Sequence, residues 1–368
     1  MTPNATSQTP RPADDGPTPA PPRTAPTRCC IVGGGPAGMM LGLLLARAGV
    51  EVVVLEKHVD FLRDFRGDTV HPSTMMVLDQ IGLRSRFEQL PQHRVSHLAG
   101  IVSGREQQAI DFRGLAPFEY LALVPQWDLL ALLADEAQKH ANFRLHMSHR
   151  ADAIIERDGR VVGVRGQTTS TADVAPPAAF EIAADLVVAC DGRHSTLRAA
   201  AGLKAHEFGA PMDVLWFRLP RKESDPPETF GLIERGHMMV LLNRSDYWQI
   251  AYLVPKGGDA ALREQPIDVL RESVAKLASF LAERVDTIAS WNDIKTLEVH
   301  IDRLQKQWHR PGLLLIGDAA HAMSPIGGVG INLAIQDAVA TANRLAPLLR
   351  GTEPIPESAL ASIAEQPC

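Results

Sequence analysis

The chain has 368 residues, of which 45% are hydrophobic and 22% are charged, and its formal net charge is −6. This composition is ordinary for a globular protein, and the net negative charge does not indicate a surface that binds nucleic acid. The longest apolar run, around Met39 to Ala46, is shorter than the roughly 18 residues that a membrane span needs, and no apolar core near the start marks a signal peptide. We therefore expect a soluble cytoplasmic protein of two or three domains, with no nucleic-acid partner and no integral membrane segment.

The four cysteines include the adjacent pair Cys29 and Cys30 and show neither a disulfide framework nor a metal-ligand spacing. We expect buried, reduced thiols and no metal site. Residues 1–28 are rich in Pro, Thr and Ala without a hydrophobic period, which predicts a disordered tail.

The first motif follows a short predicted strand, Cys29 to Val32. The run GGGPAG, from Gly33 to Gly38, opens a predicted helix over Met39 to Ala48. In a G-x-G-x-x-G of this kind, the first glycine makes a tight turn, the second lets a pyrophosphate approach the backbone, and the third lets helix and strand pack closely. The motif predicts a dinucleotide site and leaves NAD and FAD both open.

A second predicted strand, Val52 to Leu55, ends in Glu56, about 20 residues beyond the glycines. A carboxylate at this place accepts hydrogen bonds from the hydroxyls of an adenosine ribose. The agreement of strand, helix and acid favours nucleotide binding over an ordinary loop.

The segment Asp185 to Arg198 also predicts a strand followed by an acidic residue. Its apolar strand, over Leu186 to Ala189, ends at Asp191-Gly192. Arg193, Ser195 and Arg198 follow on a turn and a helix start, where cations and a hydroxyl can hold phosphates. The alternative is a structural turn with solvated arginines.

Residues 206–291 lack nucleotide signals and contain three apolar runs, VLWFRLP, HMMVLLNRS and YWQIAYLVP, that predict strands, followed by a helix over Ile267 to Ala282. Aromatic and methionine residues are concentrated here, which suits either a sheet core or a sheet face over an apolar, aromatic or polycyclic ligand. They are Phe217, Phe230, Met238, Met239, Trp248 and Tyr252.

The last motif, LLLIGDAAHAMSPIGGVGIN, is the most informative. Leu313 to Ile316 predicts a buried strand with Asp318 at its carboxyl end, where ligands of open α/β sheets bind. Pro325 and the glycines up to Gly330 let the backbone approach a flat ligand, and a helix starting near Ile331 directs its positive end at that ligand. The alternative is that Asp318 only caps a turn. His321 is expected to fix the loop rather than to act in catalysis.

Three such motifs in this order resemble the group A flavoprotein monooxygenases typified by para-hydroxybenzoate hydroxylase, over roughly Cys29 to Arg350. The resemblance implies an α/β fold, with a Rossmann-like FAD-binding domain of the glutathione-reductase type (GR2) and an inserted mixed β-sheet substrate domain. The FAD-binding domain would comprise residues 29–95, 121–205 and 300–350, and the substrate domain residues 96–120 and 206–299. Residues 351–368 are expected to form a short tail, so the chain looks truncated relative to this family.

The resemblance also implies a set of FAD contacts. Arg66 falls where the family has an arginine for the phosphates, and Gln126 lies at a strand-to-helix junction that touches the cofactor. His71 is a candidate pocket residue, with capping of the helix Pro72 to Ile81 as the alternative; no catalytic base is singled out. The complete set is Gly33, Gly35, Pro36, Ala37, Gly38, Glu56, Lys57, Arg66, Gln126, Asp191, Gly317, Asp318, Pro325, Gly328, Gly330, Ile331 and Asn332.

The implied reaction is hydroxylation of an aromatic or polycyclic small molecule, in which NADH or NADPH reduces FAD and O2 adds at flavin C4a. Two alternatives remain open: an FAD-dependent oxidoreductase that inserts no oxygen, as in the prenyl reductases, and a flavin-binding remnant without turnover. Both a monomer and a dimer are compatible with the sequence.

Overall fold

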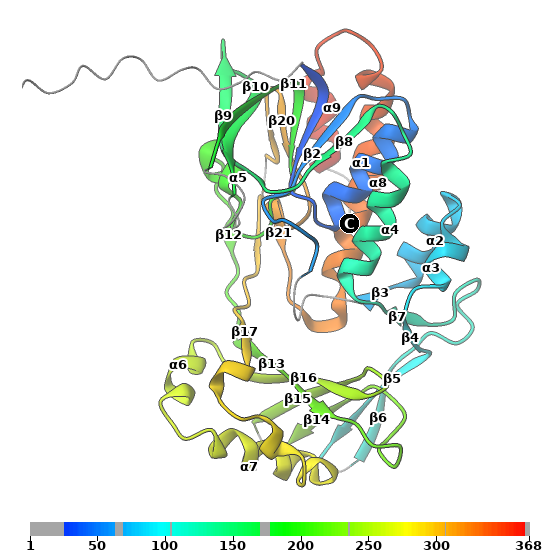
Figure 1. Ribbon diagram of the computed structural model, residues 1–368, viewed down its shortest axis with the longest axis vertical. Coiled ribbons are helices and arrows are strands. Elements are labelled where there is room, and N and C mark those ends of the chain that lie inside the picture. The colour runs from blue at the N-terminus through cyan, green and yellow to red at the C-terminus, as the bar shows by residue number, and fades with distance from the viewer. Residues whose placement is uncertain are drawn as a thin grey trace, which may run out of the picture.

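The computed structural model describes residues 26–62, 69–103, 105–169, 177–234, 236–305 and 307–364. Two large sheets dominate it, one in each half of the molecule (Figure 1). Within the described ranges no helix is long and apolar enough to cross a membrane.

The first sheet has eight strands. Six of them follow the order β19-β20-β11-β1-β2-β8, while β10 pairs with β11, and β9 pairs with β10. The pairs β1/β2, β2/β8, β1/β11 and β11/β20 are parallel. Their bounds are β1 Thr27–Val32, β2 Val52–Leu55, β8 Phe143–His146, β9 His149–Arg157, β10 Arg160–Thr168, β11 Ala179–Ala189, β19 His309–Arg310 and β20 Leu313–Leu315.

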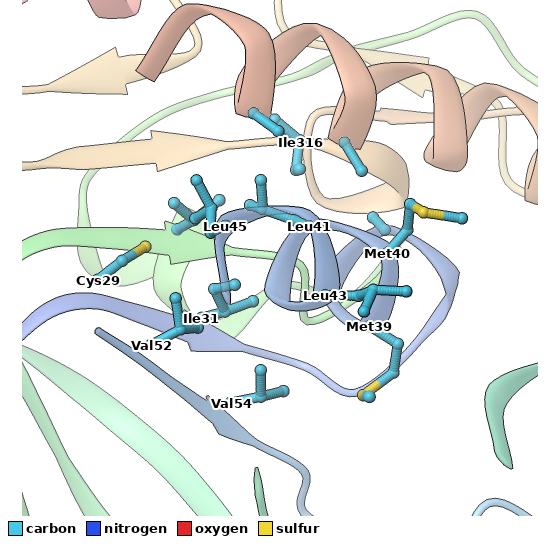
Figure 2. Packing of buried hydrophobic residues seen from close by; sticks show 14 of the residues in the cluster. Cys29, Ile31, Met39, Met40, Leu41, Leu43, Leu45, Val52, Val54 and Ile316 are labelled. Atoms are coloured by element: carbon cyan, nitrogen blue, oxygen red, sulfur yellow. The ribbon is translucent and has the colours of Figure 1, made fainter. Parts of the chain in front are cut away.

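Helices α1 (Pro36–Arg47), α4 (Gln126–Ala137) and α8 (Gly330–Leu349) cover one face of this sheet (Figure 1). The fully buried side chains of α1 pack on strand residues such as Ile31 and Val54, with Ile316 on the other side of the helix (Figure 2). Strands β1, β2 and β20 are buried on both faces, so their sequences are nearly continuous apolar runs. The sequence therefore predicts them well.

The second sheet has seven strands in the order β17-β13-β16-β15-β14-β5-β6. Two separate stretches of chain build it: β5 His97–Val102 and β6 Arg105–Asp111, then β13 Met212–Pro220, β14 Phe230–Glu234, β15 His237–Asn243, β16 Tyr247–Pro255 and β17 Lys295–Leu297. Helix α7 (Asp268–Leu277) covers the face that is turned away from the first sheet, and α6 (Gly258–Arg263) lies beside it (Figure 1).

The remaining elements are short. Two three-stranded sheets have the orders β3-β7-β4 and β12-β18-β21. Their strands are β3 Thr69–Val70, β4 His93–Val95, β7 Leu121–Leu123, β12 His206–Glu207, β18 Asp302–Arg303 and β21 His321–Ala322; the helices are α2 Pro72–Gln80, α3 Arg84–Glu88, α5 Thr196–Ala200 and α9 Glu357–Ala364.

Several predicted boundaries differ from the structure. Strand β1 begins at Thr27, inside the predicted tail, because the Thr27 hydroxyl donates to the Glu51 carbonyl at 3.1 Å; residues 1–25 lie outside the described ranges. Helix α1 begins at Pro36 rather than Met39, since a proline suits the first helical position. Residues 357–364 form α9, whose Leu360 and Ile363 are buried in the main core, so the predicted tail is partly helical.

The predicted helix over Ile267 to Ala282 ends at Leu277, where Ala278 has the non-helical angles φ −131° and ψ 82°. A 3-10 turn, η1 (Ser279–Leu281), follows. Phe280 there packs at 6.2 Å from the ring of Trp248, and Arg284 forms a buried ion pair with Asp225. These tertiary contacts divert the chain from the helix that its local sequence favours.

Most aromatic and methionine residues of the second sheet lie in the core beneath α7. Phe217, Phe230, Met239, Trp248 and Tyr252 belong to that core, whereas Met238 points to the opposite face. The interpretation that these residues together form a ligand-facing surface is therefore wrong, and they mainly stabilise the sheet.

Candidate functional site

The three motifs meet at one edge of the first sheet, where the parallel strands β1, β2, β11 and β20 all end. Backbone hydrogen bonds join these ends: the Cys190 amide donates to the Val32 carbonyl at 2.7 Å and the Ile316 amide donates to the Ala189 carbonyl at 3.1 Å. Segments far apart in the chain thus form one continuous surface at the carboxyl edge, the usual ligand position in such sheets.

The glycines at the amino end of α1 have three different environments. A Cβ on Gly33, whose φ is +111°, would lie 2.2 Å from the Cys190 carbonyl oxygen, and one on Gly38 would lie 1.9 Å from the Gly33 carbonyl oxygen. A Cβ on Gly35 would meet nothing within 4 Å in the part of the chain that the structure describes. Packing therefore accounts for Gly33 and Gly38 but not for Gly35, which borders open space.

Gly35 is also the N-cap of α1 and offers no side-chain cap, and the first turn of α1 contains no acidic residue. A helix start of this kind presents backbone N–H groups and the positive end of the helix dipole to an anion. Pro36 occupies the first turn, and the Ala37 side chain lies 3.1 Å from the Cβ position of Gly317. The site thus brings the first and last motifs into contact.

The Glu56 carboxylate lies beside this loop and is only 12% exposed. It accepts hydrogen bonds from the Gly34 amide at 2.9 Å and the His58 amide at 3.0 Å. A carboxylate at this place, at the end of the second parallel strand and beside the glycine loop, suits the hydroxyls of an adenosine ribose. Lys57, next to it, is exposed.

We expect the Glu56→Ala variant to bind FAD about 1–3 kcal/mol more weakly, the range for a lost hydrogen bond to a charged group. Fluorescence titration of the apoprotein with FAD measures this change. Glu51→Ala, at the exposed start of the same strand, is the matched control. Equal dissociation constants for Glu56→Ala and the wild type would contradict the ribose role.

The Asp191 carboxylate serves the helix that follows it. It accepts a hydrogen bond from the Ser195 hydroxyl at 2.5 Å and one from the Leu197 amide at 3.1 Å. Burial raises the pKa of Asp191, and these hydrogen bonds oppose that change. This geometry matches the structural alternative for this motif, and a direct contact between the Asp191 side chain and a cofactor stays a prediction.

Both arginines of this motif reach the last motif. Arg193 Nη2 lies 3.8 Å from Asp318 Oδ2, and Arg198 forms an ion pair with Asp302 at 2.9 Å while it donates to the Ala319 carbonyl. The arginines are therefore not simply solvated. They fix the loop that carries Asp318, whose side chain remains 36% exposed at the carboxyl edge.

Below this loop, a buried pair that the sequence did not indicate holds Gly317. The Asp337 carboxylate, on α8, accepts from the Gly317 amide at 2.7 Å and contacts His321 Nε2 at 2.7 Å. His321 thus fixes the loop, as expected. The only available signal was an acidic residue on the apolar face of α8.

Asn332 connects the amino end of α8 to the segment before α2. Its Oδ1 accepts from the His71 amide and the Thr74 hydroxyl, both at 2.8 Å, and its Nδ2 donates to the Thr69 and Gly328 carbonyls, both at 3.0 Å. All four bonding positions of this buried amide are used, so its side chain positions the loop rather than a ligand.

The loop before α8 is tightly fitted to that segment. A Cβ on Gly328, whose φ is +61°, would lie 2.5 Å from the Thr69 side chain, whereas one on Gly330 would meet no described residue within 4 Å. Pro325 begins the short turn η5 (Ile326–Gly328), and Ile331 is buried in the main core, which leaves its backbone as the group available to a ligand. Helix α8, like α1, has no side-chain cap.

The other candidates lie around this loop. His71 occupies the N-cap position of α2 without a side-chain cap bond; its Nε2 lies 2.9 Å from the Gly327 carbonyl oxygen and its ring 6.4 Å from the ring of Phe112. Gln126 is the first residue of α4 and is half-buried. Arg66 lies outside the described residues.

This arrangement fits FAD. Two uncapped helix starts face one sheet edge, and open space borders Gly35 and Gly330. The carboxylates of Glu56 and Asp318 lie at the ends of β2 and β20, where they suit sugar and ribityl hydroxyls. The α1 end would hold the pyrophosphate and the α8 end the flat ring system.

Comparison with known proteins supports this assignment. Residues 26–358 match the family model described as FAD binding domain. The 6-methylpretetramide 4-monooxygenase of Streptomyces rimosus is 34% identical over 336 residues, which cover 90% of this chain and 76% of that enzyme. The anhydrotetracycline monooxygenase of Streptomyces rimosus is 27% identical, with 88% of this chain and 63% of the relative covered. The chain therefore spans about two thirds to three quarters of the length of these two relatives.

Solved structures agree in fold. The crystal structure of pqsL, a probable FAD-dependent monooxygenase from Pseudomonas aeruginosa, superposes with a TM-score of 0.77 at 22% identity, with 93% of this chain and 91% of that chain covered. At this identity the likeness shows a shared fold, and it extends over both large sheets.

Proposed function

The chain belongs to the family of flavoproteins that share this FAD binding domain and that includes FAD-dependent monooxygenases, and on that premise we propose that it hydroxylates an aromatic or polycyclic small molecule with NADH or NADPH and O2. The observation that carries the proposal is the meeting of two uncapped helix starts and two carboxylates at one sheet edge, beneath a second sheet. The relatives whose names include 6-methylpretetramide and anhydrotetracycline favour a polycyclic substrate.

FAD, when bound, supplies the electron transfer and oxygen chemistry. The chain's own residues bind and orient the reactants. The positive end of α8 would stabilise negative charge on the flat ring, and Asn332 holds the α8 start against Thr69 and His71. We expect the second sheet to limit access of water to the reacting face, which such chemistry requires.

Removal of the Asp318 carboxylate tests the flavin end of the site. We expect Asp318→Ala to lose most of its FAD on desalting, because the ribityl chain loses charge-assisted hydrogen bonds. The ratio of flavin to protein absorbance measures retention. Asp286→Ala, an exposed acid on the second sheet's helical cover, is the control. Full retention by Asp318→Ala would refute its role.

The function itself is tested with the purified chain. We expect a flavin absorption spectrum, substrate-dependent oxidation of NADPH or NADH in air, and a product heavier by one oxygen atom from a panel of single-ring and fused-ring phenols. A product without added oxygen would instead identify an oxidoreductase that inserts none. Bound flavin without turnover with any phenol would identify a flavin-binding protein that does not catalyse.

We also infer a cytoplasmic enzyme that acts as a monomer or a dimer. Cys29, Cys30 and Cys190 are free, and burial raises the pKa of the Cys30 thiol to about 12, so this thiol stays protonated. Unpaired thiols are typical of a reducing compartment. Sedimentation with and without FAD measures the oligomeric state.

A further inference from the structure

Two glycines lie side by side in the second sheet, on the face turned toward the first. Gly100 of β5 pairs with Gly231 of β14. Their sequence neighbours Ile101, Phe230 and Leu232 pack in the core under α7, so the alternation of a strand directs both glycines to the opposite face. That face looks toward the FAD-binding half (Figure 1).

Neither backbone conformation nor packing explains these glycines. Neither residue has a positive φ. Among the described residues, a Cβ on Gly231 would meet nothing within 4 Å, and one on Gly100 would meet only the Gly231 carbonyl oxygen at 3.9 Å. By contrast, a Cβ on Gly163 or Gly166 of β10 would lie 2.3 or 1.9 Å from a neighbouring carbonyl oxygen. A glycine inside a strand weakens it and often marks a place where another molecule approaches the backbone.

Because neither glycine carries a side chain, this part of the sheet lies lower than its flanking residues, and we call it the depression. In the same row, Val240 of β15 flanks Gly231 and Gln107 of β6 flanks Gly100. These flanking strands are three strand spacings apart, or about 14 Å. Along β5, Leu98 and Val102 lie on the same face on either side of Gly100, about 13 Å from each other. A single ring would fill only part of this area.

The depression adjoins the flavin end of the proposed site. Leu98 and Leu242 pack on a small cluster that contains Phe112. The Phe112 ring lies 6.4 Å from the His71 ring, and His71 Nε2 lies 2.9 Å from the Gly327 carbonyl oxygen in the loop before α8. The glycine floor, Phe112, His71 and that loop therefore form a continuous series of contacts.

From this geometry we propose that Gly100 and Gly231 determine substrate specificity: their missing side chains let a flat fused-ring molecule of three or more rings lie on the sheet beside the flavin. This inference rests on the proposed function for the nature of the reaction. The two glycines affect the binding of the substrate and not the reaction that follows it.

The test measures binding rather than turnover. Gly231→Val fills the depression while it places a β-branched residue in a strand, where such residues are favoured, so the fold and FAD retention are expected to persist. By equilibrium dialysis, we expect 1,8-dihydroxyanthraquinone to bind this variant at least about tenfold more weakly than the wild type, the size expected when methyl groups occupy a needed space. Phenol is expected to bind both proteins equally. Gly100→Ala is expected to show a smaller effect in the same direction.

Lys295→Val is the matched control, because it introduces the same side chain on β17, four strand spacings or about 19 Å from β14. It should leave both affinities unchanged. Unchanged anthraquinone binding by Gly231→Val, an equal loss for phenol, or no anthraquinone binding by the wild type would each overturn the proposal. A wild type that binds anthraquinone through the glycines but adds no oxygen to any phenol would retain this inference and refute the proposed function.

Discussion

The Gly35→Val variant is expected to fold and to purify without FAD. A Cβ at Gly35 meets none of the described residues within 4 Å, so these residues can accept the side chain. The same space lies at the uncapped start of α1, where a pyrophosphate must reach the backbone amides. The valine side chain is therefore expected to block FAD binding without destabilising the folded protein. The variant thus tests binding separately from stability.

Three measurements check this expectation: the flavin absorbance after desalting, the affinity of the apoprotein for FAD, and the circular dichroism spectrum. Arg47→Val, an exposed position at the other end of α1, is the matched control and should keep its flavin. Gly38→Val serves as the opposite case, because a Cβ there would lie 1.9 Å from the Gly33 carbonyl oxygen and should impair folding itself. A yellow Gly35→Val protein would refute the pyrophosphate site.

The Asp225→Ala variant is expected to fold with a large loss of stability. Asp225 accepts from Arg284 at 2.6 and 2.9 Å and from Trp248 Nε1 at 2.9 Å, and the side chains of the ion pair are 3% and 7% exposed. Its removal leaves a buried guanidinium without its counter-ion, which costs about 3–5 kcal/mol. Urea unfolding measures the change. Glu283→Ala removes the surface partner of Lys222 in the same segment and should leave the midpoint unchanged.

The same carboxylate predicts an acid-dependent loss of stability. Burial alone would raise the pKa of Asp225, but hydrogen bonds from Arg284, the Lys222 amide and Trp248 outweigh it and lower the pKa from 3.8 to about 2. A lowered pKa in the folded state stabilises the protein above pH 3.8, and this contribution disappears as the pH falls toward 2. The difference in unfolding free energy between wild type and Asp225→Ala should therefore shrink over that interval. A constant difference would contradict the assignment.

The sequence predicted the family and the fold class because the motifs that carry them are local. Each consists of an apolar strand, a turn and a helix start that are adjacent in the chain, and parallel strands then bring their carboxyl ends together. The close contact of Gly38 with the Gly33 carbonyl follows from this local geometry, whereas Gly33 packs against Cys190 at the end of β11. The second sheet's main strands were predictable for the same reason, since each run is apolar and ends at a turn.

The roles of individual side chains were less predictable, because partners distant in sequence decide them. Asn332 looked like a ligand contact, but its amide is bonded to Thr69, 263 residues away. Ion pairs with Asp302 and Asp318 fix Arg198 and Arg193. Similarly, the core under α7 contains aromatic residues that composition alone did not distinguish from a ligand surface. The sequence around each of these residues contains no pattern that indicates such long-range contacts.

The order of strands in the first sheet has a consequence for how the protein is made. Strand β11 lies between β1 and β20, and α8 closes the flavin end against Thr69, so segments from opposite ends of the chain complete the same site. A ribosome delivers β20 and α8 only after all the other strands of both large sheets. Until then, residues 187–189 of β11 lack their β20 partner, and nascent chains are exposed to aggregation. Loading of the cofactor must therefore follow translation of α8, which makes FAD supply and chaperone capacity the expected limits on the yield of active protein.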